Sequence, residues 1–269
     1  MIQDLLVSSV PLVLASLGGL ISDFSGYLAV FLEGTLSLGA FLVWLIGVQT
    51  GSLATGFIIT IIITGLIGWL LSRFIALTGA NPFIAALAVN VGSQGLTETL
   101  SVLFFNTKGV LRDPRFPSAD GMLFFWIALI LIGTASFIVY RTPFGLRLRA
   151  SGRSPQVLLY RGIDPLRYRD IAWTLAAMLA AFAGGVLTIK IGAYAPGGTT
   201  GQGWIALVIV YLGFRRVWGV ALAAIVFTFI QFLGIEAQAA LAIPSTLLLG
   251  LPSLLALSLY ILSQVLRKE

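Results

Sequence analysis

Apolar runs of membrane-spanning length alternate with short polar stretches along most of the 269-residue chain. A helix needs about 20 apolar residues to cross roughly 30 Å of hydrocarbon, so a chain of this length has room for about 8 to 10 transmembrane segments. The pattern predicts segments at roughly 5–22, 28–49, 54–77, 83–105, 121–140, 171–190, 203–214, 217–234 and 245–264. We therefore predict an all-α, polytopic membrane helix bundle, with residues 1–269 forming a single transmembrane domain.

One predicted segment, "GWIALVIVYLGF" at 203–214, is too short to span a bilayer. Its twelve residues cover only about 18 Å as a helix. The stretch that leads into it, 194–203, reads "YAPGGTTGQG". Irregular backbone is tolerated at membrane depth only where protein or a water-filled cavity surrounds it. We predict a break followed by a half-helix that borders a path through the protein.

Composition narrows the class of protein further. The chain is 58% hydrophobic and 10% charged, with a mean hydropathy of +1.03, and this leaves too little polar surface to cover a soluble globule. It has no cysteine and no histidine, which excludes disulfides, thiolate and imidazole chemistry and the usual transition-metal ligands. We expect no metal site. An intramembrane enzyme is disfavoured as well, because no two carboxylates share a predicted segment.

The net charge of +6 is concentrated in one loop. Seven of the 16 Lys and Arg residues fall between Arg141 and Arg169, with one acid, Asp164, among them. The positive-inside rule makes this loop cytoplasmic. Arg73, 215–216 and 267–268 fall on the same side when crossings are counted from it, whereas 106–120 and the amino terminus come out external. We interpret the basic charge as a signal of orientation, not of nucleic-acid binding.

The loop is also punctuated by three pairs of a capping residue and a proline: Thr142–Pro143, Ser154–Pro155 and Asp164–Pro165. Each pair places a side-chain acceptor at a helix N-cap and proline at the first helical position. Gly152 and Gly162 stand where left-handed C-caps would end the first two helices. We predict short helices at about 143–151 and 155–161. Such a defined shape favours a docking surface for a cytoplasmic partner over a mere topology anchor.

The second of these helices has apolar residues that we expect to be exposed, namely Val157, Leu158, Leu159 and Tyr160. At a membrane surface they can lie on lipid head groups. They can equally lodge in a groove of another protein. The sequence favours neither interpretation.

The stretch "TPFGLRLRASGRSPQVLLYRGIDPLRYR" resembles the coupling region of bacterial ABC-importer permeases for simple sugars and nucleosides, which are related to the branched-chain amino-acid permeases. Further stretches match in the same order, at 11–41, 81–90 and 201–227. The resemblance thus covers the chain nearly end to end. It is greatest to the shorter of the two permeases of nucleoside importers.

This resemblance implies a permease subunit that is not an enzyme and binds no cofactor. ATP would be hydrolysed by a separate cytoplasmic ATPase, in agreement with the absence of a G-x-x-x-x-G-K-[ST] sequence. Further implied partners are a second permease in a heterodimer, an extracytoplasmic solute-binding protein and the lipid bilayer, with no nucleic acid. The implied location is the bacterial cytoplasmic (inner) membrane, as a multi-pass protein. Position by position, the ATPase-coupling residues would be Gly145, Arg149, Gly152, Pro155, Leu158, Arg161 and Gly162.

One motif that the resemblance implies near the translocation path is only partly present, and this affects the expected substrate. Nucleoside-type members carry Asn-x-Gly-x-Glu-Gly after the first span. Residues 29–34 here read "AVFLEG", with Ala29 and Phe31 in place of the amide and the first glycine. The path is then more apolar and suited to stacking, so a flavin-like vitamin or another small molecule stands beside nucleosides and sugars. The substrate-path candidates are Phe31, Glu33, Gly34, Asn90, Gln94, Gly201 and Gly203.

Several polar residues within the segments have a second interpretation. Glu33 is interpreted equally as a contact for the solute and as a brace for backbone exposed at a helix break. Asn90 and Gln94, one turn apart on what we expect to be one face, would otherwise form interhelical hydrogen bonds. Near the external ends, Glu98, Lys190 and Glu236 are expected to snorkel, and tryptophans near segment ends are expected to be interfacial anchors, namely Trp126, Trp173 and Trp204.

An ion-coupled secondary transporter is a competing function, since such proteins also use broken helices. The scarcity of carboxylates at the centre of the segments argues against proton coupling. The sequence therefore favours the ABC-importer permease.

Overall fold

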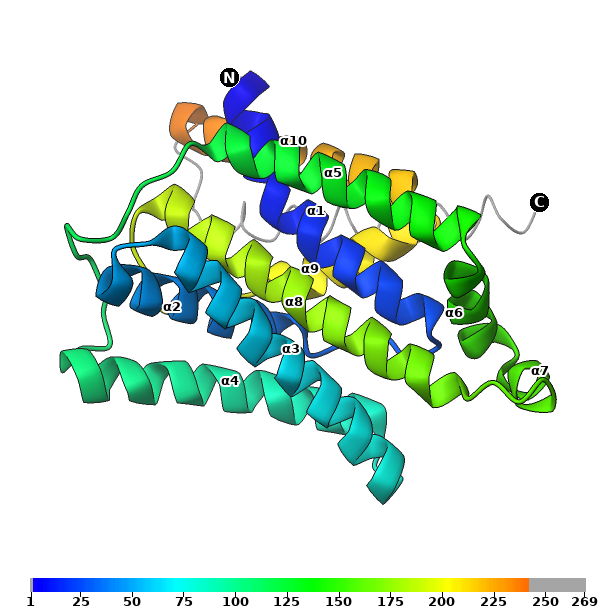
Figure 1. Ribbon diagram of the computed structural model, residues 1–269. Helices are drawn as coiled ribbons and strands as arrows, with labels where there is room; N and C mark the ends of the chain where they lie inside the picture. The colour runs from blue at the N-terminus through cyan, green and yellow to red at the C-terminus, as the bar shows by residue number, and fades with distance from the viewer. Residues whose placement is uncertain (1, 242–269) are drawn as a thin grey trace.

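The computed structural model of the protein describes residues 2–241, and over this range the chain forms ten helices and no strand (Figure 1). The predicted all-α class is confirmed. The predicted segment 245–264, and Arg267 and Lys268, lie outside the described residues. The helices are α1 (Ile2–Phe24), α2 (Leu32–Thr50), α3 (Leu53–Thr78), α4 (Pro82–Phe105), α5 (Gly121–Arg141), α6 (Pro143–Arg153), α7 (Pro155–Tyr160), α8 (Pro165–Ile191), α9 (Gln202–Leu212) and α10 (Val217–Leu241).

Six of the described helices are long and apolar enough to cross a membrane, namely α1, α2, α3, α5, α8 and α10. The multi-pass membrane character predicted from the sequence is thereby confirmed. Helix α9 has 11 residues, so the predicted half-helix is also confirmed. Helix α4 has 24 residues but is not among the six. The segment predicted at 83–105 thus forms a helix that is more polar than the other six, because it carries Asn90, Gln94 and Glu98.

Helices α2 and α8 form the centre of the bundle. Helix α8 packs along α1, α2 and α3 (Figure 1), and it does so with a row of fully buried alanines and two buried glycines. A Cβ atom added at Gly39 of α2 would collide with the backbone of Ala181, and one added at Gly184 would collide with the carbonyl of Leu36. The two backbones are therefore in direct contact, as small residues allow in membrane bundles.

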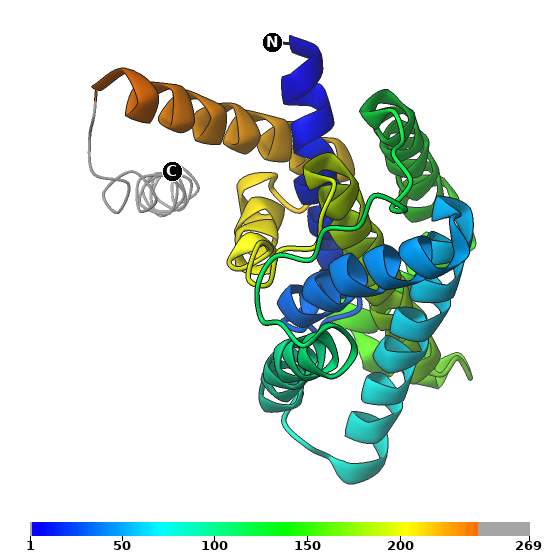
Figure 2. The same ribbon diagram turned by 90° about the vertical axis from the view of Figure 1, so that its left-hand side faces the viewer.

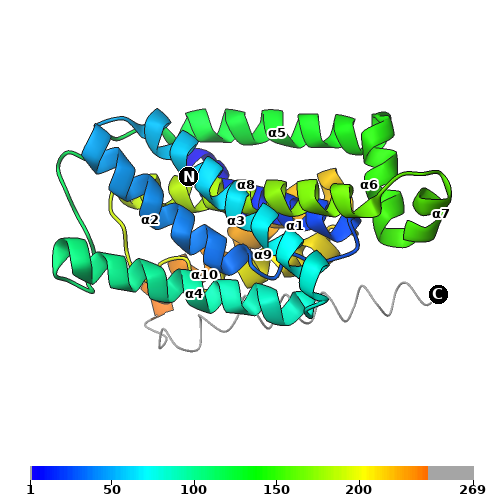
Figure 3. The ribbon, with the colours of Figure 1, turned by 60° about the horizontal axis from the view of Figure 1, so that its bottom comes forward.

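The peripheral helices complete this bundle on several sides. Helix α10 contacts α1, α9 and α5, and Figure 2 shows it, in orange, running outward beside α1. Helix α4 lies against α2 along one border of the bundle (Figure 3). The outer positions of α3, α5 and α10 carry large exposed apolar side chains, as a lipid-facing surface requires.

The basic segments gather at one end of the molecule, where α6 and α7 lie (Figure 1). Arg215, in the turn between α9 and α10, forms an ion pair with Asp23 at the end of α1. At the opposite end, Leu111 and Tyr194 exchange two backbone hydrogen bonds of 2.8 and 3.0 Å. The expected grouping of Arg73, 141–170 and 215–216 is thus present in the fold, and the assignment of this end to the cytoplasm stays a prediction.

Candidate functional site: the basic end and the α2–α9 junction

Helix α6 begins as the sequence predicts. The hydroxyl of Thr142 accepts a hydrogen bond of 3.3 Å from the backbone N–H of Gly145, and Pro143 occupies the first helical position. Gly145 lies directly against the carbonyls of Ile138 and Val139 at the end of α5. A side chain at this position would push α6 away from α5, so the glycine fixes the angle between the two helices.

The predicted C-cap at Gly152 is wrong. Helix α6 continues to Arg153, and Gly152 lies within its last turn. The glycine is required for another reason: a Cβ atom there would lie 2.6 Å from the backbone nitrogen of Gly26. Helix α6 therefore packs backbone to backbone on the segment that joins α1 to α2.

Helix α7 is a short rod with its predicted C-cap but without the predicted N-cap bond. Ser154 makes no side-chain capping bond, although Pro155 begins the helix. Gly162 has φ of +70° and donates a backbone hydrogen bond of 2.9 Å to Leu159, which confirms the left-handed C-cap. The rod is thus held at its end by glycine in a conformation that other residues adopt at a cost.

The apolar residues of α7 divide between two faces. Leu158 is buried, with 4% of its surface exposed, so the expectation that it is exposed is wrong. Val157, Leu159 and Tyr160 are 50%, 59% and 92% exposed. Leu158 holds the rod to the protein, while the other three form an outward apolar surface, which we call the α7 surface.

The two arginines expected at the coupling joint occupy different settings. Arg149 donates to the carbonyl of Gly145 and its guanidinium lies 5.5 Å from the centre of the Tyr140 ring, so it is held against the α5–α6 corner. Arg161 directly follows α7 and is exposed. Only Arg161 is therefore available next to the α7 surface.

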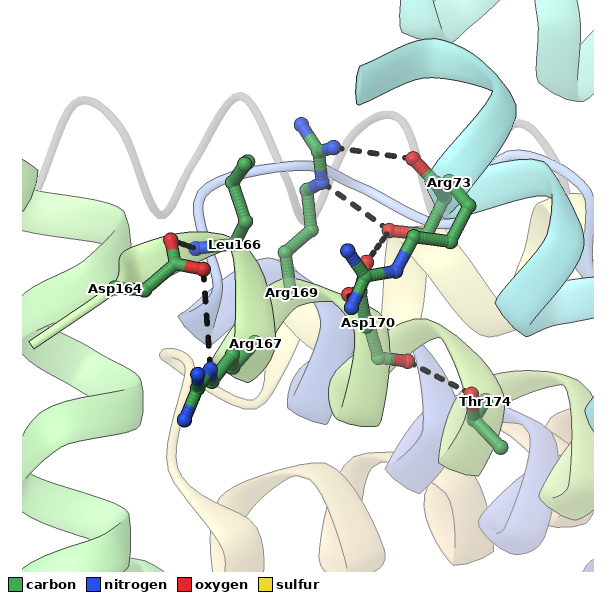
Figure 4. Close-up of polar contacts among 8 residues, drawn as sticks. Arg73, Asp164, Leu166, Arg167, Arg169, Asp170 and Thr174 are labelled. Atoms are coloured by element: carbon green, nitrogen blue, oxygen red, sulfur yellow. Dashed lines mark hydrogen bonds and ion pairs between the residues drawn. The ribbon is translucent and has the colours of Figure 1, made fainter. Parts of the chain in front are cut away.

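A buried polar cluster lies where α3 ends and α8 begins (Figure 4). The Asp170 carboxylate accepts a hydrogen bond of 2.6 Å from the Ser72 hydroxyl and forms an ion pair of 2.8 Å with Arg73. Arg169 donates to the hydroxyl and the carbonyl of Ser72 at 3.2 and 3.1 Å. This cluster was not predicted, because its only signal in the sequence is charge at the ends of two apolar segments.

The cluster continues into the segment between α1 and α2. The Arg169 guanidinium lies 5.0 Å from the centre of the Tyr27 ring, and Trp173 donates to the carbonyl of Tyr27 at 3.1 Å. Trp173 is fully buried, so its expected role as an interfacial anchor is wrong. Its ring packs at 5.0 Å from that of Phe31, which joins the basic end to the start of α2.

Glu33, in the first turn of α2, caps the half-helix α9. Its two carboxylate oxygens accept hydrogen bonds of 2.6 and 2.7 Å from the backbone N–H groups of Gly201 and Gly203. The first N–H groups of a helix have no partner within it and carry partial positive charge, so a carboxylate is well suited to them. Gly203 approaches so closely that a Cβ atom would lie 2.5 Å from the Glu33 nitrogen.

Asn90 joins α4 to the same region. Its side-chain oxygen accepts from the N–H of Gly34 at 2.7 Å, and its amide donates to the carbonyl of Val30 at 2.8 Å. A Cβ atom at Gly34 would lie 2.7 Å from the Asn90 Cα. Asn90 thus satisfies backbone groups exposed by the break before α2, and its bond to Gly34 of α2 is the interhelical hydrogen bonding considered from the sequence.

The structure brings six of the seven path candidates together at this α2–α9 junction: Phe31, Glu33, Gly34, Asn90, Gly201 and Gly203. Phe31 is fully buried. Gln94 does not join them: it lies one turn after Asn90 on α4, but its side chain is exposed whereas that of Asn90 is buried, so the two side chains do not share the buried face. Whether any of the seven contacts solute stays a prediction.

The remaining polar residues lie apart from the junction. Lys190 donates to the Ser8 hydroxyl at 2.7 Å, and Glu98 is exposed on α4. The side chain of Glu236 lies outside the described residues. Within residues 2–241, no group of three or more acidic, cysteine or histidine side chains could hold a metal ion.

Comparison with known proteins identifies the family to which this chain belongs. Residues 1–259 match the family described as the permease component of the branched-chain amino acid transport system. The chain belongs to this family. It is a transport permease subunit and not an enzyme.

Among its relatives, the permease is 28% identical over 255 residues to the guanosine ABC transporter permease protein NupQ of Bacillus subtilis, covering 86% of this chain and 80% of NupQ. It is 26% identical over 250 residues to the nucleoside ABC transporter permease protein NupC of Lactococcus lactis, covering 84% and 79%. A putative glucose ABC transporter permease, TsgC13 of Haloferax volcanii, is also 26% identical, with 84% and 74% covered.

The fold resembles that of PsaBC from Streptococcus pneumoniae, solved in complex with Fab. The TM-score is 0.57 and the identity is 12%, with 96% of this chain and 88% of that chain covered. At this identity the likeness concerns the fold alone. Family membership implies, in general terms, an ATPase and a solute-binding protein as partners of the permease.

Proposed function

We propose that this permease is one of two permease subunits in an importer driven by a separate ATPase, and that α6 and α7 are its joint to that ATPase. The permease itself binds no cofactor, and ATP is hydrolysed by the partner. The observation that carries this proposal is the α7 surface. Tyr160, Val157 and Leu159 project outward from a rod that Leu158 and Gly162 hold in place.

Such a surface suits a partner protein better than lipid. A short helix with apolar anchors fits a groove of another protein, and the exposed Arg161 beside it offers a charged contact at the rim. The rod is also too short, at six residues, to act as an amphipathic membrane helix on its own, because isolated helices of this length are unstable in water.

The structure supports a route by which movement of α6 would reach the interior. Gly152 of α6 lies against Gly26, and the 25–31 segment continues into α2, whose Glu33 holds the start of α9. A displacement of α6 would therefore move the segment that precedes the α2–α9 junction. This is a proposed mechanical route, and each of its contacts is open to mutation.

For the solute, we propose a nucleoside or a simple sugar, and a flavin-like vitamin is the second candidate. The nucleoside class is supported by the relatives named for guanosine and nucleosides, both covering most of this chain. The Phe31 ring, which raised the possibility of stacking, is enclosed against Trp173. It is thus not available to a solute in this conformation, which weakens the case for a flat aromatic vitamin.

Reconstitution tests the proposal directly. The permease is placed in liposomes with a second permease, an ATPase and a solute-binding protein of the same transporter, and uptake of labelled guanosine, glucose and riboflavin is measured. We expect uptake only with ATP and with both permeases present. Uptake driven by an ion gradient without ATP, or full activity of this permease without a second one, would contradict the proposal.

A further inference from the structure

The half-helix α9 is held at both ends, and its last residues are joined to α10 by a tight turn at 213–216. A Cβ atom at Gly219 would collide with the carbonyl of Gly213, and one at Gly213 would collide with the backbone nitrogen of Val220. The end of α9 and the first turn of α10 are therefore in backbone contact. Because no side chain separates them, these two helix ends must move together.

The backbone of this turn is held in an unfavourable conformation. Phe214 and Arg215 have φ of +54° and +55°, in the left-handed region that residues other than glycine rarely adopt. Among the residues that the structure describes, Asn106 is the one further non-glycine residue with positive φ, and asparagine tolerates this region better. A strained backbone of this kind persists only where surrounding contacts hold it.

Contacts from three helices hold the turn. The N–H of Arg215 donates to the carbonyl of Val210 in α9 at 3.0 Å, and its guanidinium forms the ion pair with Asp23 at the end of α1. The third contact comes from α5, because the Tyr140 hydroxyl accepts a hydrogen bond of 3.2 Å from the N–H of Val217. Val217 is the first residue of α10, so its N–H has no acceptor within that helix.

Tyr140 also contacts α6, which lies beside this end of α5 (Figure 1). The Arg149 guanidinium is 5.5 Å from the centre of the Tyr140 ring, within the range of a cation–π attraction. Arg149 donates to the carbonyl of Gly145 in the same helix at 3.3 Å, so its charged group moves with α6. One side chain thus contacts α6 through its ring and α10 through its hydroxyl.

We propose that Tyr140 is a positioning residue through which α6 acts on the α9–α10 turn. This inference rests on the proposed function of α6 and α7 as the joint to the ATPase. When α6 moves, Arg149 leaves the Tyr140 ring, the hydroxyl separates from the N–H of Val217, and the turn loses the contact from α5. The strained turn then relaxes, and the end of α9 shifts with α10. The route through Gly152 reaches the start of α9, and this second route reaches its end.

A fluorescent reporter on the turn tests this route without a solute. The chain has no cysteine, so Arg216→Cys, at an exposed position in the turn, takes a single environment-sensitive dye before the permease is assembled with its partners. Emission of the complete transporter in liposomes is compared before and after addition of ATP with orthovanadate, which arrests the ATPase. We expect the emission wavelength to shift in the otherwise unchanged permease. Tyr140→Phe should reduce this shift about threefold, because phenylalanine keeps the ring and lacks the hydroxyl acceptor.

Ser136→Ala is the matched control. Ser136 lies one turn before Tyr140 on α5 and accepts a hydrogen bond of 3.1 Å from the indole N–H of Trp218, so this variant also loses one bond between α5 and α10. We expect it to keep the full shift and to unfold at the same temperature as Tyr140→Phe. A full shift in Tyr140→Phe, or an equal reduction in Ser136→Ala, would overturn the positioning role. A lower unfolding temperature in Tyr140→Phe alone would assign its hydroxyl to stability instead.

The step from Arg149 to Tyr140 has its own test. Arg149→Leu should reduce the shift as Tyr140→Phe does, and the double variant should reduce it no further, because both changes interrupt one route. Additive reductions would show that the two residues act separately. Absence of ATP-driven uptake by the wild-type transporter would contradict the proposed function, whereas ATP-driven uptake without any shift of the dye would overturn this inference alone.

Discussion

The Glu33 carboxylate and the backbone N–H of Gly203 are joined by a hydrogen bond of 2.7 Å across 170 residues of sequence. Together with the bond from Gly201, this contact attaches the half-helix α9 to the first turn of α2. A half-helix inside a membrane protein exposes N–H groups that lipid cannot satisfy. The capping carboxylate is therefore a condition for the break to exist.

We predict that Glu33→Ala destabilises the permease more than Glu33→Gln does. Alanine leaves both N–H groups without an acceptor, at about 1–3 kcal/mol for each buried group, while glutamine keeps one acceptor oxygen. Thermal unfolding of the detergent-solubilised protein measures the order. Glu98→Gln makes the same chemical change at an exposed position and should unfold like the wild type. Equal unfolding temperatures for wild type and both Glu33 variants would rule out the capping role.

We predict that Gly152→Ala weakens transport without preventing insertion. The added methyl group would collide with the backbone of Gly26, and overpacking of this kind costs about 1–3 kcal/mol. It would separate α6 from the 25–31 segment. Uptake by the reconstituted transporter is the measurement. Gly133→Ala in α5 is the matched control, because a Cβ atom there meets nothing within 4 Å, and a Gly152→Ala protein as active as this control would contradict the proposed route.

The caps of α6 and α7 and the short length of α9 could be predicted from the sequence, because each depends on residues close together in the chain. Thr142 with Pro143, and Gly162 after α7, act through neighbouring residues only, and both caps are present. The shortness of α9 is likewise a property of its own segment. The prediction that Gly152 ends helix α6 is wrong because the residue it packs against, Gly26, lies far away in the chain. Nothing in the local sequence distinguishes a glycine at a helix C-cap from a glycine required for close packing.

Burial and contacts between distant segments could not be predicted, because they depend on how the helices pack against one another. Trp173 was placed at the end of a segment predicted to begin at 171, but α8 begins at Pro165, which carries the ring into the bundle. Asn90 and Gln94 are about 40° apart around a helix, yet the boundary of the buried face falls between them. The bond between Ser72 and Asp170 spans 98 residues, a pairing that hydropathy does not encode.

We predict that Gly162→Val uncouples transport while the protein still inserts. Valine in the left-handed conformation of this position, with φ of +70°, carries a penalty of about 1–2 kcal/mol, so the end of α7 should fray. The basic residues that set orientation are unchanged. Membrane content and ATP-driven uptake are measured together, and Gly133→Ala again serves as control. Normal insertion, ATPase assembly and wild-type uptake in Gly162→Val would show that α7 is not the joint.

We predict that Asp170→Asn loosens the contact between α3 and α8 at the basic end. The variant loses the ion pair with Arg73 and the charge that faces Arg169 and Ser72. Asp170 is buried, with 4% of its side chain exposed, while Arg73 is 42% exposed, so we expect a loss of about 2 kcal/mol, within the range for hydrogen bonds to charged groups. Thermal unfolding measures this loss, with Asp113→Asn as the control. The Asp113 carboxyl is held only by Arg115 in an exposed loop, where that guanidinium lowers its pKa to about 2.

Ser72→Ala in the Asp170→Asn background should add little, because the hydroxyl has then already lost its charged acceptor. Additive losses in the double variant would show that Ser72 and Asp170 act independently, against the cluster described here.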